Sequence, residues 1–186
     1  MESTRMDTIR NLVDQNPVLL FMKGTRVAPR CGFSARVVQI LDALLPDYQT
    51  VDVLADPAIR EGVKQYSSWP TIPQLYIRGE FVGGCDIITE LFENGGLHQK
   101  LGVTAPDPPK ISATEEAVRA LKEAVGEEGE FLRLEVDSEF EHALSIGPRQ
   151  PGDIEVELNG LTLLVDRMSA MRADGVHIEC IQSSEG

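Results

Sequence analysis

The chain has 186 residues, of which 42% are hydrophobic and 25% charged, and only three are cysteines. This composition excludes a wholly disordered chain, a collagen-like repeat and a disulfide-dense mini-protein. The net charge of −13 argues against general nucleic-acid binding, which relies on lysine and arginine to neutralise phosphates. No apolar run approaches the roughly 20 residues needed to span a bilayer, so we expect neither a nucleic-acid nor a membrane partner.

The charge is divided unevenly along the chain. Residues 1–106 carry a net charge of −2, whereas residues 107–186 carry −11. Residues 105–110 contain three prolines, which is typical of a short, semi-rigid linker. We therefore predict two domains, 1–105 and 111–183, joined by a linker over 106–110.

The first hundred residues alternate between the hydrophobic periods of helices and of strands. Asp56 followed by Pro57 predicts a helix start, with the carboxylate as N-cap and proline at the first helical position. The expected elements are a helix over 8–13, a strand over 18–22, a loop over 23–30, a helix over 35–45, a strand over 48–53, a helix from Asp56 to about Tyr66, a hairpin of strands over 74–77 and 80–82, and a helix that Asp86 caps. This order predicts an α/β domain with a small mixed sheet and helices on both faces.

The second domain opens with a helix signal and continues with strand patterns. Ser112 followed by Glu115 fits a capping box at the start of a helix that runs to about Val125. Asn159-Gly160 is the strongest short signal for a hairpin turn. The expected strands cover 131–136, 140–146, 154–158, 161–165 and 176–181, with a short helix near Met168. This pattern indicates a small α+β, β-rich domain.

Cys31 is the strongest candidate for a chemically active residue. It follows a loop and immediately precedes a predicted helix, whose N-terminal N–H groups and partial positive charge favour a thiolate. Lys23, Arg26 and Arg30 add local positive charge. The competing interpretation is a buried, inert cysteine. Because the odd count of three cysteines has no disulfide spacing, we expect a reducing, cytoplasmic location.

Four short segments of the first domain carry a resemblance to a known family. They are Met22-Lys23-Gly24-Thr25, Cys31-Gly32-Phe33-Ser34, Trp69-Pro70-Thr71-Ile72-Pro73 and Gly83-Gly84-Cys85-Asp86. In this order and spacing they resemble the signatures of monothiol, CGFS-type glutaredoxins. The resemblance implies a thioredoxin-like fold with its redox-active centre at Cys31.

The resemblance also implies that the domain binds glutathione. Ser34 stands where dithiol relatives carry a second cysteine, so Cys31 depends on an external thiol, which in similar proteins is glutathione. Pro73 is then the cis-proline of the fold. It leaves the backbone of Ile72 to pair with the cysteinyl part of glutathione as a short strand addition.

The remaining implied contacts hold the two ends of glutathione. The amides of Cys85 and Asp86 suit the γ-glutamyl carboxylate, and the Asp86 side chain suits the ammonium group. Lys23 and Arg60 are expected to bind the glycine carboxylate. From the residues alone, Lys23 and Arg60 are also consistent with solvated surface charges, and Cys85 with a small buried side chain.

Two functions of the glutaredoxin-like domain are open at this point. In the first, two protomers each supply Cys31 and one glutathione thiolate to a labile [2Fe-2S] cluster, which needs four such ligands. The protein is then a homodimeric cluster carrier in iron–sulfur assembly and redox homeostasis, with donor or recipient proteins as partners. In the second, Cys31 catalyses glutathione-dependent thiol–disulfide exchange, or deglutathionylation. The resemblance favours the first function, because CGFS-type proteins are typically poor at the second.

The second domain is similar to A-type iron–sulfur carrier (HesB-like) proteins. Ile111-Ser112, Gly152-Asp153 and the segment from Asn159 to Ser169 carry this resemblance. Functional members have a cysteine in an early loop and a Cys-x-Cys pair near the C-terminus, whereas residues 137–142 contain no cysteine and Cys180 matches no ligand position. We expect Cys180 to be a structural residue within a strand. The domain is interpreted as a relative that has lost its cluster ligands, either an acidic accessory domain or a docking module for cluster donors or recipients.

Overall fold

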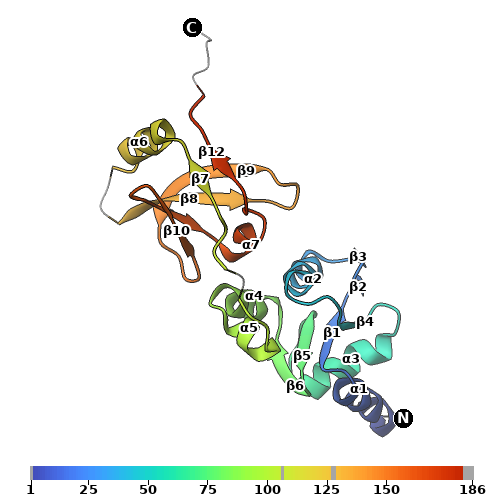
Figure 1. Cartoon of the computed structure of the whole chain (residues 1–186). Helices are drawn as coiled ribbons and strands as arrows, with labels where there is room; N and C mark the ends of the chain where they lie inside the picture. The colour runs from blue at the N-terminus through green and yellow to red at the C-terminus, as the bar shows by residue number, and fades with distance from the viewer. Residues whose placement is uncertain (1, 106, 127–128, 182–186) are drawn as a thin grey trace. The chain divides into compact units, whose positions relative to one another are not determined.

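The computed structural model describes residues 2–105, 107–126 and 129–181 of the chain. Contacts divide the chain into two compact units, residues 1–104 and 105–186. Each unit has its own hydrophobic core. Figure 1 shows a sheet with helices in the first unit and a strand-rich second unit. Within the described ranges, no helix is long and apolar enough to cross a membrane.

The first unit is built on a four-stranded mixed sheet. Its elements are α1 (Glu2–Gln15), β1 (Val18–Met22), β2 (Gly24–Thr25), β3 (Ala28–Pro29), α2 (Gly32–Leu44), β4 (Gln49–Asp52), α3 (Pro57–Ser67), β5 (Gln74–Ile77), β6 (Glu80–Gly83), α4 (Cys85–Glu93) and α5 (Gly96–Leu101). The sheet has the strand order β4-β1-β5-β6. β1 pairs with β4 in parallel and with β5 antiparallel, and β5 and β6 form the predicted hairpin. The predicted α/β order and mixed sheet are confirmed.

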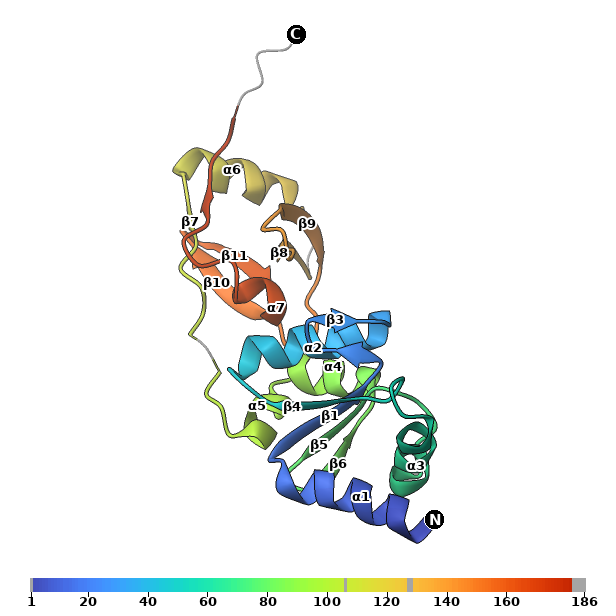
Figure 2. The ribbon, with the colours of Figure 1, turned by 90° about the vertical axis from the view of Figure 1, so that its right-hand side faces the viewer.

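The central strand β1 is buried on both of its faces. Leu19, Leu20, Phe21 and Met22 are fully buried, although alternate residues of a strand point to opposite sides. Both faces of the sheet therefore need an apolar cover. α1 and α3 pack together on one face, whereas α2 and α4 pack together on the other, as Figure 2 shows.

Several local features of the first unit differ from the prediction. Asp86 does not cap α4, because Gly84 is the N-cap and Asp86 lies in the first turn, where its charge still interacts favourably with the helix dipole. The loop over 23–30 contains the antiparallel pair β2 and β3. α1 begins six residues before the predicted start, since its first turns are polar and lack an apolar stripe. α5 is not among the predicted elements, because six residues between two glycines show too little periodicity.

The second unit combines a four-stranded sheet with one longer helix. Its elements are β7 (Ser112–Ala113), α6 (Glu115–Ala124), β8 (Glu130–Val136), β9 (His142–Pro148), β10 (Ile154–Leu158), β11 (Leu161–Val165), α7 (Arg167–Ala170) and β12 (His177–Ile178). The sheet has the order β10-β11-β8-β9, and β7 and β12 form a separate parallel pair. The helix α6 buries Val118 in the core, together with Leu132 and Leu134 of β8. A β-rich second unit is confirmed.

The start of the second unit corrects the capping-box prediction. Thr114, and not Ser112, is the N-cap of α6, and its hydroxyl accepts a hydrogen bond from the Ala117 N–H at 3.2 Å. Ser112 lies in β7, where its hydroxyl is 2.8 Å from Nδ1 of His177. The helix start is displaced because the pairing of β7 with β12 keeps residues 112–113 extended.

Strand β12 is shorter than the sequence predicts. It covers only His177–Ile178 and not 176–181, because only these two residues pair with β7. Cys180 is exposed and follows the strand, so its predicted placement within a strand is wrong. The hairpin between β10 and β11 is confirmed, since Asn159 and Gly160 have φ angles of 49° and 81°, as this tight turn requires.

The side chains of Arg133 and Asp153 form a buried ion pair in the second unit. The two terminal guanidinium nitrogens of Arg133 donate to the two carboxylate oxygens of Asp153 at 2.6 and 2.8 Å, and the exposed fractions of these side chains are only 8% and 2%. Arg133 also donates to the Pro148 carbonyl, and Asp153 accepts from the Gln150 N–H. Burial alone would raise the pKa of Asp153, but these hydrogen bonds outweigh burial and lower it below the ordinary value.

We expect Arg133→Met to destabilise the second unit by about 3–5 kcal/mol at neutral pH, because it leaves a buried carboxylate without its partner. Since the folded-state pKa of Asp153 is lowered, the ion pair stabilises the unit above the ordinary pKa of about 3.9, and this contribution is lost as the pH falls through the folded-state pKa. Hydrogen exchange of the β8 and β11 amides at several pH values measures both effects.

The double variant Arg133→Met/Asp153→Leu is the matched control for this ion pair. It removes both charges and is expected to recover most of the lost stability, because no charge then remains buried alone. Exchange rates in Arg133→Met equal to those of the unsubstituted chain would contradict the stabilising role of the pair.

Candidate functional site

A cavity of about 330 Å³ lies in the first unit. This volume is at the lower end of the range of about 300–1,000 Å³ that is typical of small-molecule sites. Its lining residues are Lys23, Phe33, Arg60, Lys64, Trp69, Pro70, Thr71, Ile72, Pro73, Gly84, Cys85 and Asp86. Every predicted site residue except Cys31 is in this set. The other seven lining residues are not among the predicted site residues, and of these seven only Lys64 falls outside the recognised motifs.

Cys31 lies at the edge of this site and not in the lining of the cavity. It is the N-cap of α2, and its carbonyl accepts a hydrogen bond from the Ala35 N–H at 2.9 Å. Its side chain is partly exposed, and Phe33 of the same helix start lines the cavity. Cys31 is close enough to Cys85 for their charges to interact. The structure thus brings all six predicted residues into one region.

The loop between β1 and α2 is held by hydrogen bonds to its own ends. The Lys23 N–H donates to the Ser34 hydroxyl at 3.1 Å, and the Arg30 N–H donates to the Lys23 carbonyl at 2.9 Å. The Gly24 N–H donates to Oδ1 of Asp52 at 2.9 Å. Because Ser34 is fully buried, its hydroxyl supports the backbone of Lys23 and is not available as a nucleophile.

Arg26 does not add positive charge to Cys31 in the way that the sequence suggests. Its guanidinium donates to Asp42 at 2.7 Å, lies 3.4 Å from Asp47 and stacks on Tyr48 at 4.5 Å from the ring centroid. Two carboxylates therefore compensate its charge. The assignment of Arg26 to the positive environment of Cys31 is wrong.

Cys85 is the first residue of α4 and is partly buried. Burial raises the pKa of its thiol, a hydrogen bond with Thr89 lowers it by less, and the nearby Asp86 raises it further. The net shift is upward, so the thiol form of Cys85 is favoured at neutral pH. Because the thiolate is the nucleophile and the metal ligand, the side chain of Cys85 is poorly suited to either role.

The N-terminus of α4 contributes backbone amides to the cavity. The first N–H groups of a helix have no acceptor within that helix, and here they belong to residues that line the cavity. A Cβ atom on Gly84 would lie 3.1 Å from the indole nitrogen of Trp69, so glycine permits their close packing. Trp69 also packs on Phe81, with ring centroids 5.7 Å apart.

Two buried donors near the cavity have no hydrogen-bond partner in the part of the chain that the structure describes. They are Nε of Arg60 and Nε1 of Trp69. Arg60 lies in the first turn of α3, so the start of this helix sets its position. The predicted start is confirmed, because the Asp56 carboxylate accepts from the N–H groups of Ala58 and Ile59 at 2.8 and 3.2 Å. An unsatisfied buried guanidinium nitrogen is costly, so Arg60 is suited to binding an anionic group of a ligand.

The loop before β5 is held by a buried glutamine. Nε2 of Gln74 donates to the carbonyls of Trp69 and Thr71 at 3.0 and 3.1 Å. The peptide bond between Ile72 and Pro73 is cis, as expected. Gln74 is not among the predicted site residues, although a polar residue at the start of an apolar strand is the signal of a buried hydrogen-bonding group.

Comparison with known proteins identifies the family of the first unit. The family model described as Glutaredoxin matches residues 18–82. A monothiol glutaredoxin ycf64-like protein of Synechocystis is 58% identical over 95 residues, which are 51% of this chain and 89% of that protein. The probable monothiol glutaredoxin 2 of Rickettsia typhi is 50% identical over 101 residues, which are 54% of this chain and 91% of that protein. The chain therefore belongs to the monothiol glutaredoxin family.

Two solved structures are similar to part of this chain. The solution structure of a truncated mutant of Trypanosoma brucei 1-C-Grx1 is 43% identical, has a TM-score of 0.49, and covers 55% of this chain and 96% of that one. The solution structure of reduced poplar apo GrxS14 is 49% identical, has a TM-score of 0.47, and covers 52% of this chain and 88% of that one.

We expect iodoacetamide to modify Cys85 several-fold more slowly than Cys180 at neutral pH. Cys180 is exposed, whereas Cys85 is partly buried and its pKa is raised by that burial. The modification of Cys85 should accelerate as the pH increases. Mass spectrometry of the alkylated peptides measures both rates. Thr89→Val removes the hydrogen bond that lowers the pKa and should slow Cys85 further, so faster modification in this variant would contradict the stated cause.

Proposed function

We propose that the first unit binds glutathione in the cavity beside Cys31 and that Cys31 and the glutathione thiol together carry a labile [2Fe-2S] cluster. The observation that carries this proposal is the cavity, which collects the other five predicted site residues at the helix start that bears Cys31. Membership of the monothiol glutaredoxin family supports it.

The charges around the cavity match those of glutathione, which has two carboxylates and one ammonium group. Lys23 and Arg60 are suited to the glycine carboxylate, and the unpartnered Nε of Arg60 supports this role. The first amides of α4 are suited to the γ-glutamyl carboxylate, and Asp86 to its ammonium group. No hydrogen bond is found for the backbone of Ile72 within the described residues, so it is open to a short strand addition.

The thiols of the chain fit a cluster whose other ligands come from outside the protomer. Ser34 provides no second thiol, and Cys85 is held as a thiol by burial. One protomer thus offers Cys31 and the thiol of one bound glutathione. Since a [2Fe-2S] cluster takes four thiolates, we propose that two protomers share it as cargo. Ligands that can dissociate suit delivery to a recipient protein.

A second candidate function is supported by the partial exposure of Cys31 beside the cavity. In this function the Cys31 thiolate attacks the glutathione sulfur of a mixed disulfide, and the substrate leaves as a thiolate. A second glutathione thiolate then attacks the Cys31 mixed disulfide, which releases oxidised glutathione and regenerates the Cys31 thiolate. The protein would then be a glutathione-dependent thiol–disulfide oxidoreductase.

We further propose that the second unit is a HesB-like domain without cluster cysteines and that the protein works in a reducing, cytoplasmic compartment. The sequence resemblance supports the first statement. The free state of all three cysteines supports the second. The acidic second unit is proposed to guide cluster donors or recipients by its charge, since a strong field of one sign steers association.

Cluster loading distinguishes the two candidate functions. Anaerobic reconstitution with iron, sulfide and glutathione is expected to give a coloured [2Fe-2S] species with two protomers per cluster. Cys31→Ser should lose this visible absorption, because it removes one protein ligand per protomer. Cys180→Ser is the matched control and should retain it, since Cys180 is exposed in the other unit. A colourless chain that rapidly turns over a glutathione mixed disulfide would overturn the carrier proposal.

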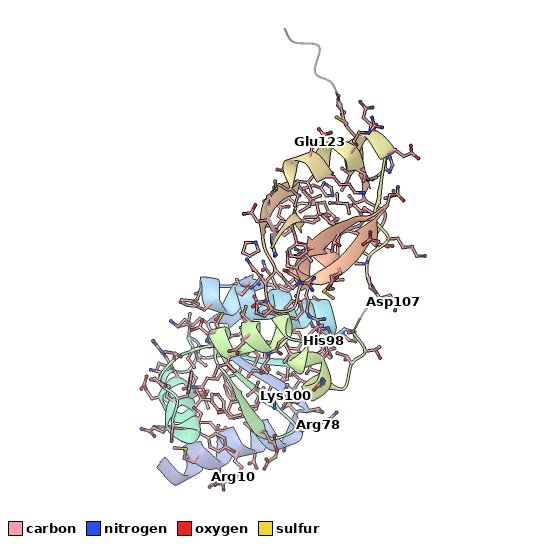
Figure 3. All side chains as sticks on the ribbon, turned by 90° about the vertical axis from the view of Figure 1, so that its left-hand side faces the viewer. Arg10, Arg78, His98, Lys100, Asp107 and Glu123 are labelled. Carbon is pink, nitrogen blue, oxygen red and sulfur yellow. The ribbon has the colours of Figure 1, made fainter. Side chains whose placement is uncertain are left out.

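Glutathione affinity tests the cavity directly. Arg60→Gln should weaken binding about tenfold to a hundredfold, because a charge-assisted hydrogen bond contributes about 1.5–3 kcal/mol. The fluorescence of Trp69, the single tryptophan, measures binding because this residue lines the cavity. Arg10→Gln on the exposed side of α1 (Figure 3) is the control and should bind normally. Equal affinity of the two variants would contradict the role of Arg60.

A further inference from the structure

The two edge strands of the second unit differ in composition. β10 carries Glu155 and Glu157, and charges on an edge strand discourage pairing with another chain. β9 has no charged residue over 142–148, yet almost its whole length is exposed. Leu144 and Ile146 are 44% and 42% exposed. An exposed, apolar edge of this length is a template for the addition of another strand.

The backbone of β8 shows which groups of β9 point away from the sheet. The Val136 N–H donates to the Ser169 hydroxyl at 2.8 Å, and the Val136 carbonyl accepts from Arg172 at 3.2 Å. The backbone N–H and C=O groups of Val136 therefore point toward α7 and away from β9. Because successive residues of a strand direct their backbone groups to opposite neighbours, the odd-numbered residues of β8 are those that bond to β9.

The register then assigns each residue of β9 to one side. The odd-numbered residues of β8 pair with Ala143, Ser145 and Gly147, so these three bond inward. The even-numbered residues of β9 direct their N–H and C=O groups to the free edge. Leu144 and Ile146, which are among them, lie opposite Leu134 and Leu132 and therefore share the face of the sheet that carries the core.

We propose that β9 pairs antiparallel with β9 of a second copy of the chain, around a two-fold axis at Ser145. The segment from Glu141 to Arg149 is self-complementary in this register. Leu144 of one copy lies opposite Ile146 of the other, and Glu141 lies opposite Arg149. This symmetry of the sequence favours a second copy over an unrelated partner, because each favourable pair occurs twice.

The same register pairs the outward backbone groups of Leu144 and Ile146 on the free edge. Leu144 and Ile146 both direct their polar groups outward, so they exchange two hydrogen bonds with each other at each side of the axis. His142 lies opposite Pro148, whose carbonyl already accepts from Arg133 and can take a second hydrogen bond from the His142 N–H. Because proline has no N–H to donate, the His142 carbonyl stays bonded to water. The two Leu144–Ile146 pairs extend the apolar face across the interface, and each such pair contributes about 0.2–1 kcal/mol.

Charge acts in two ways on this pairing. Arg149 already binds Glu155 and lies over the ring of Phe131 within its own unit, and Glu141 of the second copy would bring a second carboxylate near it. The net −11 of residues 107–186 repels a like-charged copy over a longer range. Added salt screens the long-range repulsion, so the dimer should become stronger as the ionic strength increases.

This inference does not depend on glutathione or on a cluster. If both proposals hold, the pairing of second units keeps two glutaredoxin units in one assembly. It would then raise the effective concentration at which the two Cys31 thiolates meet. Cys31→Ser should load no cluster but should still form the β9 dimer. A variant that loses the β9 dimer should still bind glutathione.

Sedimentation of the full chain without iron or glutathione tests the pairing. We expect a reversible dimer in the micromolar range that tightens with salt. Leu144→Lys should weaken it about tenfold or more, because it places a charge in both apolar pairs. Glu157→Gln on the opposite edge changes the net charge by the same amount and should dimerise normally. A monomer at all concentrations would overturn the proposal.

Cross-linking tests the register itself in a chain whose three native cysteines are replaced by serine. Two Ser145 residues would face each other in a non-hydrogen-bonded pair with Cα atoms about 4.5 Å apart, which a disulfide can join. Ser145→Cys should therefore form a covalent dimer under mild oxidation. Ala143→Cys on the same face lies opposite Gly147 and should cross-link far less. Equal cross-linking of the two variants, or none, would refute the two-fold axis at Ser145.

Discussion

Strand β1 can be buried on both faces only if helices cover both sides of the sheet, and the site follows from this requirement. The chain leaves β1 at Met22 and must return over the sheet as α2. The turn is closed by the hydrogen bond from Arg30 to Lys23 and by the support of Ser34. The same closure places Lys23 at the cavity and Cys31 at the start of α2. The burial of β1 on both faces therefore determines where Lys23 and Cys31 lie.

Most of the first unit could be predicted because its signals are local. The apolar run 18–22, the Asp56 cap and the tight turn between β5 and β6 are each determined by a few neighbouring residues. Two features of the site were missed because they depend on contacts that a sequence pattern does not show. Arg26 meets Asp42 and Asp47, which are 16 and 21 residues away, so its neutralisation is not visible in a sequence pattern. The partners of Gln74 depend on the conformation of the loop before it, which only the fold defines.

The second unit shows the same division between local and distant effects. The turn at Asn159-Gly160 is correctly predicted because its backbone geometry depends on those two residues. The helix start at Thr114 is displaced from Ser112 by a strand pairing across 65 residues, which outweighs the local capping preference. The ion pair of Arg133 and Asp153 joins residues 20 positions apart and is likewise not encoded in a local pattern.

Ser34 links the number of thiols in the site to the shape of the loop. Its hydroxyl is both the group that replaces a second cysteine and the acceptor that fixes the Lys23 backbone. A cysteine at this position would differ by one atom, but sulfur is a weaker acceptor and a larger atom in a fully buried place. A change from one thiol to two would therefore also loosen the backbone that presents Lys23. The number of thiols at the start of α2 and the backbone position of Lys23 therefore depend on the same side chain.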